Sequence, residues 1–115
     1  MANTFKQISK AGVTSSDVIY TVAGSTTTVV LGLIIGNTQS SAITVTLTLS
    51  TDTGSRSGAN NEDNQPVELL TSTTIPANSS LELLAGNKIV LETTDVINLT
   101  ASAAADISIS VMEIT

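Results

Sequence analysis

Histidine and cysteine are both absent from this chain of 115 residues. Without them there is no Ser-His-Asp triad, no Cys-His dyad, no disulfide, and no metal site built on imidazole or thiolate ligands. The lysines, Lys6, Lys10 and Lys88, lie in polar or turn contexts, where nothing would desolvate an amine and make it nucleophilic. No glycine-rich phosphate-binding motif is present. The sequence therefore predicts a protein that is not an enzyme, with no catalytic residue, no cofactor and no metal ligand.

Aromatic and basic residues are scarce. Phe5 and Tyr20 are the only aromatic residues, and there is no tryptophan on which a sugar or an unpaired base could stack. Ten acidic residues outnumber four basic ones, which leaves a net charge of -6. Such a surface repels phosphate groups, so we expect no nucleic-acid partner and no docking on anionic lipid.

Long apolar runs are also missing. The longest, 29–35, is interrupted by Gly32 and is much shorter than the roughly 18 residues of a membrane span. The opening segment 1–6 lacks the apolar stretch of a signal peptide. We therefore expect no membrane partner.

Threonine and serine are abundant, and threonine often alternates with isoleucine, valine or leucine. In 42–50, AITVTLTLS, apolar and hydroxyl side chains alternate throughout, which is the pattern of a half-buried strand. No segment keeps a helical spacing of apolar residues beyond one turn. Strand patterns occupy 17–22, 26–37, 42–50, 67–75, 81–84, 88–92, 96–101 and 106–114. Their short, even spacing predicts an all-β fold, a single β-sandwich or jelly-roll-like domain of about eight antiparallel strands.

The chain divides into a polar start and a strand-rich remainder, 17–115. Residues 1–16 show no strand pattern, so they form either an N-terminal arm that orders against a partner or an ordinary frayed terminus. The polar stretch 51–66 is predicted to be a long loop that is either mobile or functional.

The last strand changes phase near its end. Ile107, Ile109 and Val111 share one face, whereas Met112 and Ile114 lie on the other. Either a bulge resets the face, or the far face of the strand's end is covered, for example by a neighbouring subunit.

Two motifs in the loop 51–66 have a chemical interpretation. The Asp-Thr-Gly of 52–54 resembles the signature of aspartic proteases, but the Ile-Ile-Gly of 34–36 precedes it, whereas in the retroviral family that supporting element follows. A hairpin tip explains the motif better. The loop also holds oxygen ligands for a hard cation, at a spacing that matches no EF-hand, so a solvated loop is favoured: Asp52, Asn60, Asn61, Glu62 and Asp63.

Most of the chain carries a family resemblance. Its segments are 4–6 (TFK), 18–22 (VIYTV), the strand at 26–37, 75–83 (IPANSSLEL), 86–91 (GNKIVL), 95–103 (DVINLTASA) and 109–115 (ISVMEIT). Together they resemble small virion structural proteins of tailed bacteriophages, especially cyanophages and related marine phages. The resemblance implies a β-sandwich that serves as a capsid decoration (cement) protein, a neck or tail accessory, or a fibre-like attachment module. The loop 51–66 departs from the family's common pattern.

We therefore expect a non-catalytic structural component of a virion that is assembled in the cytoplasm of a bacterial host. Its partners would be the major capsid protein or other virion proteins and further copies of itself, with a trimer favoured. The alternative is a virion-displayed glycan-binding module that uses the loop and the threonine faces, although the lack of aromatic residues counts against it. The expected assembly contacts are Phe5, Lys6, Ile8, Lys10, Arg56, Asn60, Asn61, Met112 and Ile114.

Overall fold

The computed structural model describes residues 2–51, 66–84 and 86–115. Within these ranges the chain forms nine antiparallel strands and the predicted all-β fold is confirmed. The strands are β1 (Asn3–Val13), β2 (Asp17–Thr21), β3 (Thr27–Asn37), β4 (Ile43–Ser50), β5 (Val67–Ile75), β6 (Ser80–Leu83), β7 (Ile89–Leu91), β8 (Val96–Ala101) and β9 (Ala105–Ile114).

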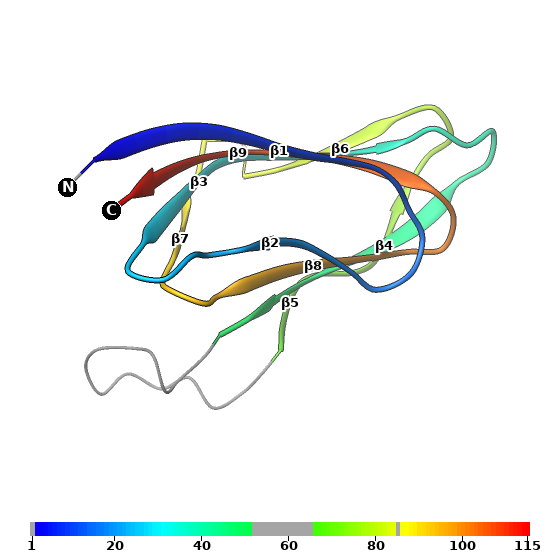
Figure 1. The fold of residues 1–115 in the computed structure, drawn as a ribbon. Coiled ribbons are helices and arrows are strands. Elements are labelled where there is room, and N and C mark those ends of the chain that lie inside the picture. Colours follow the sequence, from blue (N-terminus) through cyan, green and yellow to red (C-terminus); the bar gives the residue numbers. More distant parts are fainter. Residues whose placement is uncertain (1, 52–65, 85) are drawn as a thin grey trace.

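Two sheets pack against each other. One has five strands in the order β1-β9-β3-β6, with β7 also paired to β3, and the other has four in the order β2-β8-β4-β5. β1 pairs with β9, β2 with β8, β3 with β6 and β7, and β4 with β5. The chain is thus one long hairpin rolled into two layers, which is a jelly-roll arrangement. Figure 1 shows these layers and the two termini side by side, where Ala2 and Thr115 exchange backbone hydrogen bonds.

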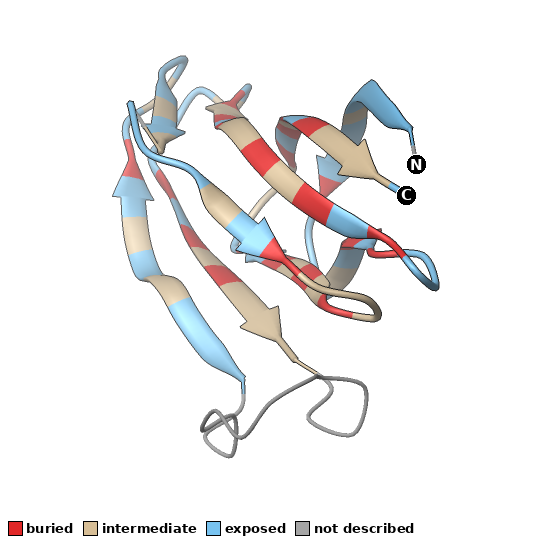
Figure 2. Cartoon of the chain, turned by 90° about the vertical axis from the view of Figure 1, so that its left-hand side faces the viewer, coloured by how far each residue is buried: buried red, intermediate tan, exposed pale blue. Residues whose placement is uncertain are grey.

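Aliphatic side chains fill the space between the sheets. β4 buries Ile43, Val45 and Leu47 and directs its threonines outward, as the alternation predicts. The same banding of buried and less buried residues runs along the other inner strands in Figure 2. Each buried Leu, Ile or Val contributes roughly 1.5–3 kcal/mol relative to exposure. The core therefore holds the two sheets together without the help of disulfides.

A buried asparagine connects three chain segments at one end of the sandwich. Asn37, at the end of β3, is 3% exposed. Its side-chain amide donates to the carbonyls of Ser41, Ile75 and Pro76 at 2.9, 3.0 and 3.1 Å, and its carbonyl accepts from the backbone N–H of Gln39 at 2.8 Å. The hydrogen bonds satisfy the buried amide and join the β3–β4 connection to the turn after β5.

The N-terminal segment differs from the expectation of an arm or a frayed terminus for 1–16. It forms strand β1, which pairs with β9 in unbroken register over residues 3–10. Val13 is fully buried, and Ile8 packs against the core. Gly12, at a φ of 69°, lies where the register shifts, in a backbone conformation that glycine adopts readily. Asn3–Val13 is therefore part of the sandwich.

The sheet contains a β-bulge near the phase change of the last strand, but the bulge lies in the neighbouring strand β3. Val30 opposes Val111 and Gly32 opposes Ser110, so Leu31 is an extra residue in β3. β9 itself keeps an unbroken register with β1 over residues 107–114. A bulge in β9 is therefore not the explanation of the phase change.

Candidate assembly surface

The surface of the five-stranded sheet that faces away from the core carries a continuous row of apolar side chains. Phe5 in β1 lies opposite Met112 in β9, and Met112 lies opposite Val29 in β3. Val29 in turn lies opposite Val90 in β7. Directly opposed residues on antiparallel strands project from the same face. We call these four residues the apolar row and the surface that carries them the outer face.

The ends of the apolar row are the most exposed large hydrophobic side chains in the described part of the chain. Phe5 is 72% exposed and Val90 is 62% exposed, while Val29 and Met112 between them are half-buried. Ile34, at 44% exposure, lies on the same face of β3. Single exposed apolar residues need no explanation, but a contiguous set across a sheet marks an interaction surface.

On β1, β9 and β3, no charged residue lies in the apolar row or in the rows on either side of it. On one side the residues are Asn3, Ile114 and Thr27, and on the other they are Gln7, Ser110 and Gly32. Next to β7, Lys88 and Glu92 each lie two residues from Val90. Within the paired strands, the charges on this face are Glu82, opposite Ile34, and Asp106, opposite Gly36. A chain of net charge -6 thus keeps the middle of this face uncharged. Depletion of charge is typical of the centre of a protein interface.

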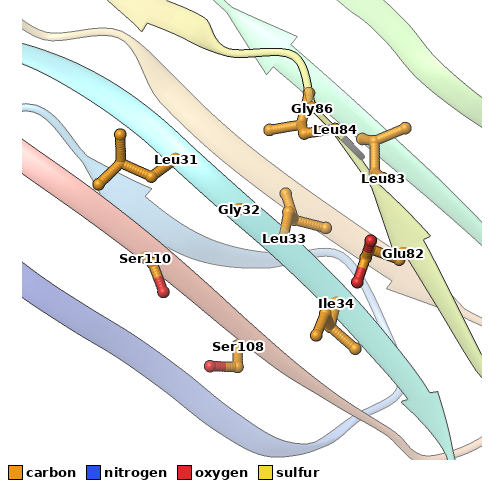
Figure 3. A pocket seen from close by; sticks show the side chains of 10 residues that line it. All are labelled: Leu31, Gly32, Leu33, Ile34, Glu82, Leu83, Leu84, Gly86, Ser108 and Ser110. Carbon is orange, nitrogen blue, oxygen red and sulfur yellow. The ribbon is translucent and has the colours of Figure 1, made fainter.

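A hollow of about 250 Å³ adjoins the apolar row. β7 pairs with residues 28–30 of β3 and β6 with residues 33–36, so neither strand covers Leu31 and Gly32. Ser108 and Ser110 of β9 border the hollow on one side and Leu84 on the other, as Figure 3 shows. A Cβ at Gly32 would meet no atom within 4 Å. The hollow is smaller than the roughly 300–1,000 Å³ of small-molecule sites, so it suits a single inserted side chain better.

A polar cluster lies on the inner side of the same sheet, beneath the apolar row. The hydroxyl of Tyr20, from the other sheet, donates to the carboxylate Oε2 of Glu113 at 2.5 Å and lies 2.7 Å from the hydroxyl of Thr28. Since the single phenolic hydrogen goes to Glu113, Thr28 donates to Tyr20. Lys6 Nζ lies 3.0 Å from the other oxygen of Glu113. The cluster joins the two sheets near the chain termini.

Burial raises the pKa of Tyr20 to about 12 from its ordinary value of 10.0, and the hydrogen bond to Glu113 adds to this. The hydrogen bond from Tyr20, with a further one from Lys6, lowers the pKa of Glu113. The fold therefore favours a neutral phenol next to an ionised carboxylate.

Tyr20→Phe is expected to change how stability depends on pH. The neutral phenol stabilises the wild type fully below pH 10, and this contribution is lost as the pH rises from 10 to 12, on the order of 2–3 kcal/mol. The variant lacks that loss. At acidic pH the stability of the wild type also falls, because the carboxylate of Glu113, whose pKa is lowered, becomes protonated. The variant lacks the phenol that helps to lower this pKa, so its stability falls less in this range. Urea unfolding over both pH ranges measures the difference.

The phenol is the only one in the chain, so its ultraviolet absorbance titrates Tyr20 directly. A midpoint near pH 10 in the folded wild type would contradict the buried hydrogen bond.

The residues predicted as assembly contacts lie on different surfaces of the sandwich. Phe5 and Met112 are adjacent in the apolar row, and Ile114 lies in the next row of the outer face. Lys6 and Ile8 lie instead on the inner side of β1, where Lys6 pairs with Glu113 and Ile8 packs against the core.

The other predicted contacts lie elsewhere. Lys10 lies opposite Ile107, and its Nζ is 3.9 Å from an oxygen of Asp17. Arg56, Asn60 and Asn61 lie outside the described residues, as do the protease-like motif 52–54 and the cation ligands of the loop. Sequence reasoning missed Val29 and Val90, because only the cross-strand register reveals that they continue the row from Phe5.

Threonines line the outward side of the four-stranded sheet. Thr46 lies opposite Thr100, and Thr44 lies opposite Thr74. Neither aromatic residue serves this surface, because Phe5 is on the other sheet and Tyr20 is buried. The surface thus offers hydroxyl groups to a ligand but no ring on which a sugar could stack.

Comparisons with known proteins find no significant match to a family model, a curated protein or a solved structure. In residues 2–51, 66–84 and 86–115, no three acidic side chains gather in a way that could hold a metal ion. The same ranges hold no helix long and apolar enough to cross a membrane.

Proposed function

We propose that this chain is a non-catalytic structural component of a tailed-phage virion, and that the outer face of its five-stranded sheet is the surface through which it assembles. The observation that carries the proposal is the apolar row, which crosses the sheet from Phe5 to Val90 and has uncharged neighbours on β1, β9 and β3. Such a row in water is unfavourable, and burial against another subunit removes that cost.

Two further observations support the proposal. The sequence motifs resemble small virion proteins, and jelly rolls are frequent in capsid proteins. Since a fold does not dictate a function, the apolar row carries more weight than the architecture. Among places in the particle, we favour capsid decoration, in which the protein cements subunits of the major capsid protein. Placement as a neck, tail or fibre accessory uses the same surface.

Glycan binding by a virion-displayed module is the second candidate. The facing threonines of the four-stranded sheet favour it, because paired hydroxyls can hydrogen-bond an extended sugar chain. A glycan array without any hit would remove this candidate and leave the structural role intact.

Ile114→Asp is expected to weaken binding to the particle by about tenfold or more, because it places an uncompensated charge in the uncharged part of the outer face. The measurement is co-sedimentation of the purified variant with particles that lack the protein. Thr46→Asp is the matched control, since it adds the same charge to the outward side of the other sheet. The structural role through this face is contradicted if Ile114→Asp binds particles as the wild type does.

A further inference from the structure

Any partner of the outer face must match its charge as well as its apolarity. β1, β9 and β3 offer no carboxylate in the rows next to the apolar row for a basic partner to neutralise. The acidic groups of the face are Asp106, Glu82 at the far side of the hollow, and Glu92 beyond the end of β7. β1 offers no lysine to an acidic partner, because Lys6 and Lys10 lie at inward positions and pair with Glu113 and Asp17. The exposed Lys88 lies beyond the end of β7, at the edge of the face. The surface complementary to the middle of the outer face is therefore another uncharged, apolar sheet face.

We propose that the occupant is a second copy of this chain, packed outer face against outer face around a two-fold axis with one apolar row over the other. The inference rests on the proposed function, because it names the partner of the same surface. A two-fold contact requires a surface that is complementary to itself. The outer face meets this requirement in charge, area and shape.

Charge makes the outer face the favourable place for two copies to meet. Two chains of net charge -6 repel each other wherever their acidic groups approach. The uncharged rows around Met112 and Ser110 keep these groups away from the centre of the contact. Burial of Phe5 and Val90 then removes the two most exposed large apolar side chains from water.

The area of the face is close to what a stable contact needs. Four strand widths of about 4.8 Å and the 11 residues of β3 at about 3.3 Å each cover about 700 Å². A standard interface buries about 800 Å² on each partner. Two such faces therefore approach the standard size without help from other parts of the chain.

The shape of the face is also self-complementary, since it carries both a projection and a hollow. Phe5 projects at the β1 edge, and the hollow of about 250 Å³ over Gly32 lies on the opposite side of β9. A large side chain of one copy has a place in the hollow of the other, and the two-fold axis repeats that contact. Packed apolar centres of this kind account for most of the binding energy in interfaces.

The test measures the oligomeric state of the purified protein by sedimentation equilibrium, with a pair of matched variants. Val90→Asp puts a charge at the end of the apolar row, where the wild-type side chain is 62% exposed. Val18→Asp makes the same change on the other sheet, at a side chain that is 55% exposed. We expect the wild type and Val18→Asp to be dimers. We expect the dimer of Val90→Asp to have a dissociation constant about a hundredfold larger. Circular dichroism verifies that both variants are folded.

A wild type that stays monomeric, forms the trimer favoured by the sequence, or remains dimeric after Val90→Asp would overturn the inference. The proposed function fails separately, in the particle-binding experiment with Ile114→Asp. A monomer that binds particles through this face contradicts only the second copy as partner. If the protein is a dimer but is not found in the particle, only the proposed virion role is contradicted.

Discussion

Deletion of residues 2–13 is expected to unfold the domain. The deleted strand β1 pairs with β9 and contributes Val13 to the core and Ile8 to its edge. Its loss exposes the inward side chains Ile109 and Val111 of β9 to water and makes β9 an unprotected edge. The loss of hydrogen bonds and apolar contacts is comparable to the whole stability of a small domain, about 5–15 kcal/mol.

Thermal unfolding followed by circular dichroism measures this effect. A control chain with Gln7→Ala and Ser9→Ala keeps β1 but changes two of its outward side chains, and it should melt within a few degrees of the wild type. If the truncated chain melted cooperatively at the wild-type temperature, residues 2–13 would be the dispensable arm that the sequence suggested.

Asn37→Leu is expected to lower the free energy of unfolding by about 2–4 kcal/mol. The substitution removes the amide that donates to the carbonyls of Ser41, Ile75 and Pro76. It leaves them without this partner, including the carbonyl of the buried Ile75. Leaving a buried acceptor without a hydrogen bond costs more free energy than burial of the leucine side chain gains. The connection after β3 and the turn after β5 should both become less ordered, because the side chain that joins them is gone.

Urea unfolding at neutral pH measures the change, and hydrogen exchange locates it. Gln7→Leu is the control, because it exchanges an amide for leucine at an exposed position and should change stability by less than about 1 kcal/mol. Equal stability of Asn37→Leu and the wild type would show that the three carbonyls find other partners.

Much of the fold could be predicted from the sequence because its strands alternate. The strands at 67–75 and 96–101 were predicted with the bounds that the structure has, and the others that were predicted differ by one residue at one or both ends. In β4 each apolar residue faces the core and each threonine faces outward, so the local pattern and the tertiary environment agree.

β1 could not be predicted in this way, because its polar and apolar residues do not alternate in agreement with the inward and outward positions of the strand. The inward positions hold Lys6 and Lys10 beside Ile8, and the outward positions include Phe5. The lysines tolerate inward positions at the sheet edge because their long side chains reach carboxylates, as Lys6 reaches Glu113 at 3.0 Å. Such a partner is distant in sequence, so no local rule could reveal it.

The candidate surface was predictable only in part for a related reason. The out-of-phase Met112 and Ile114 are visible in the sequence, and the structure places both on the outer face. The rest of the apolar row depends on which residue of β3 lies opposite Met112, and the extra residue Leu31 alters that register within the strand. Cross-strand register is set by the whole sheet and is not encoded in any one segment.

A cryo-EM map of the native particle, with the density of this chain located, addresses the proposed role without any variant. We expect repeated copies of the sandwich at fixed positions, with Phe5, Met112 and Val90 buried against a neighbouring subunit. Copies over the capsid lattice would support a cement protein, and copies at the neck, tail or fibre would support an accessory. A particle without this chain, or one in which the outer face is open to solvent, would contradict the assembly role.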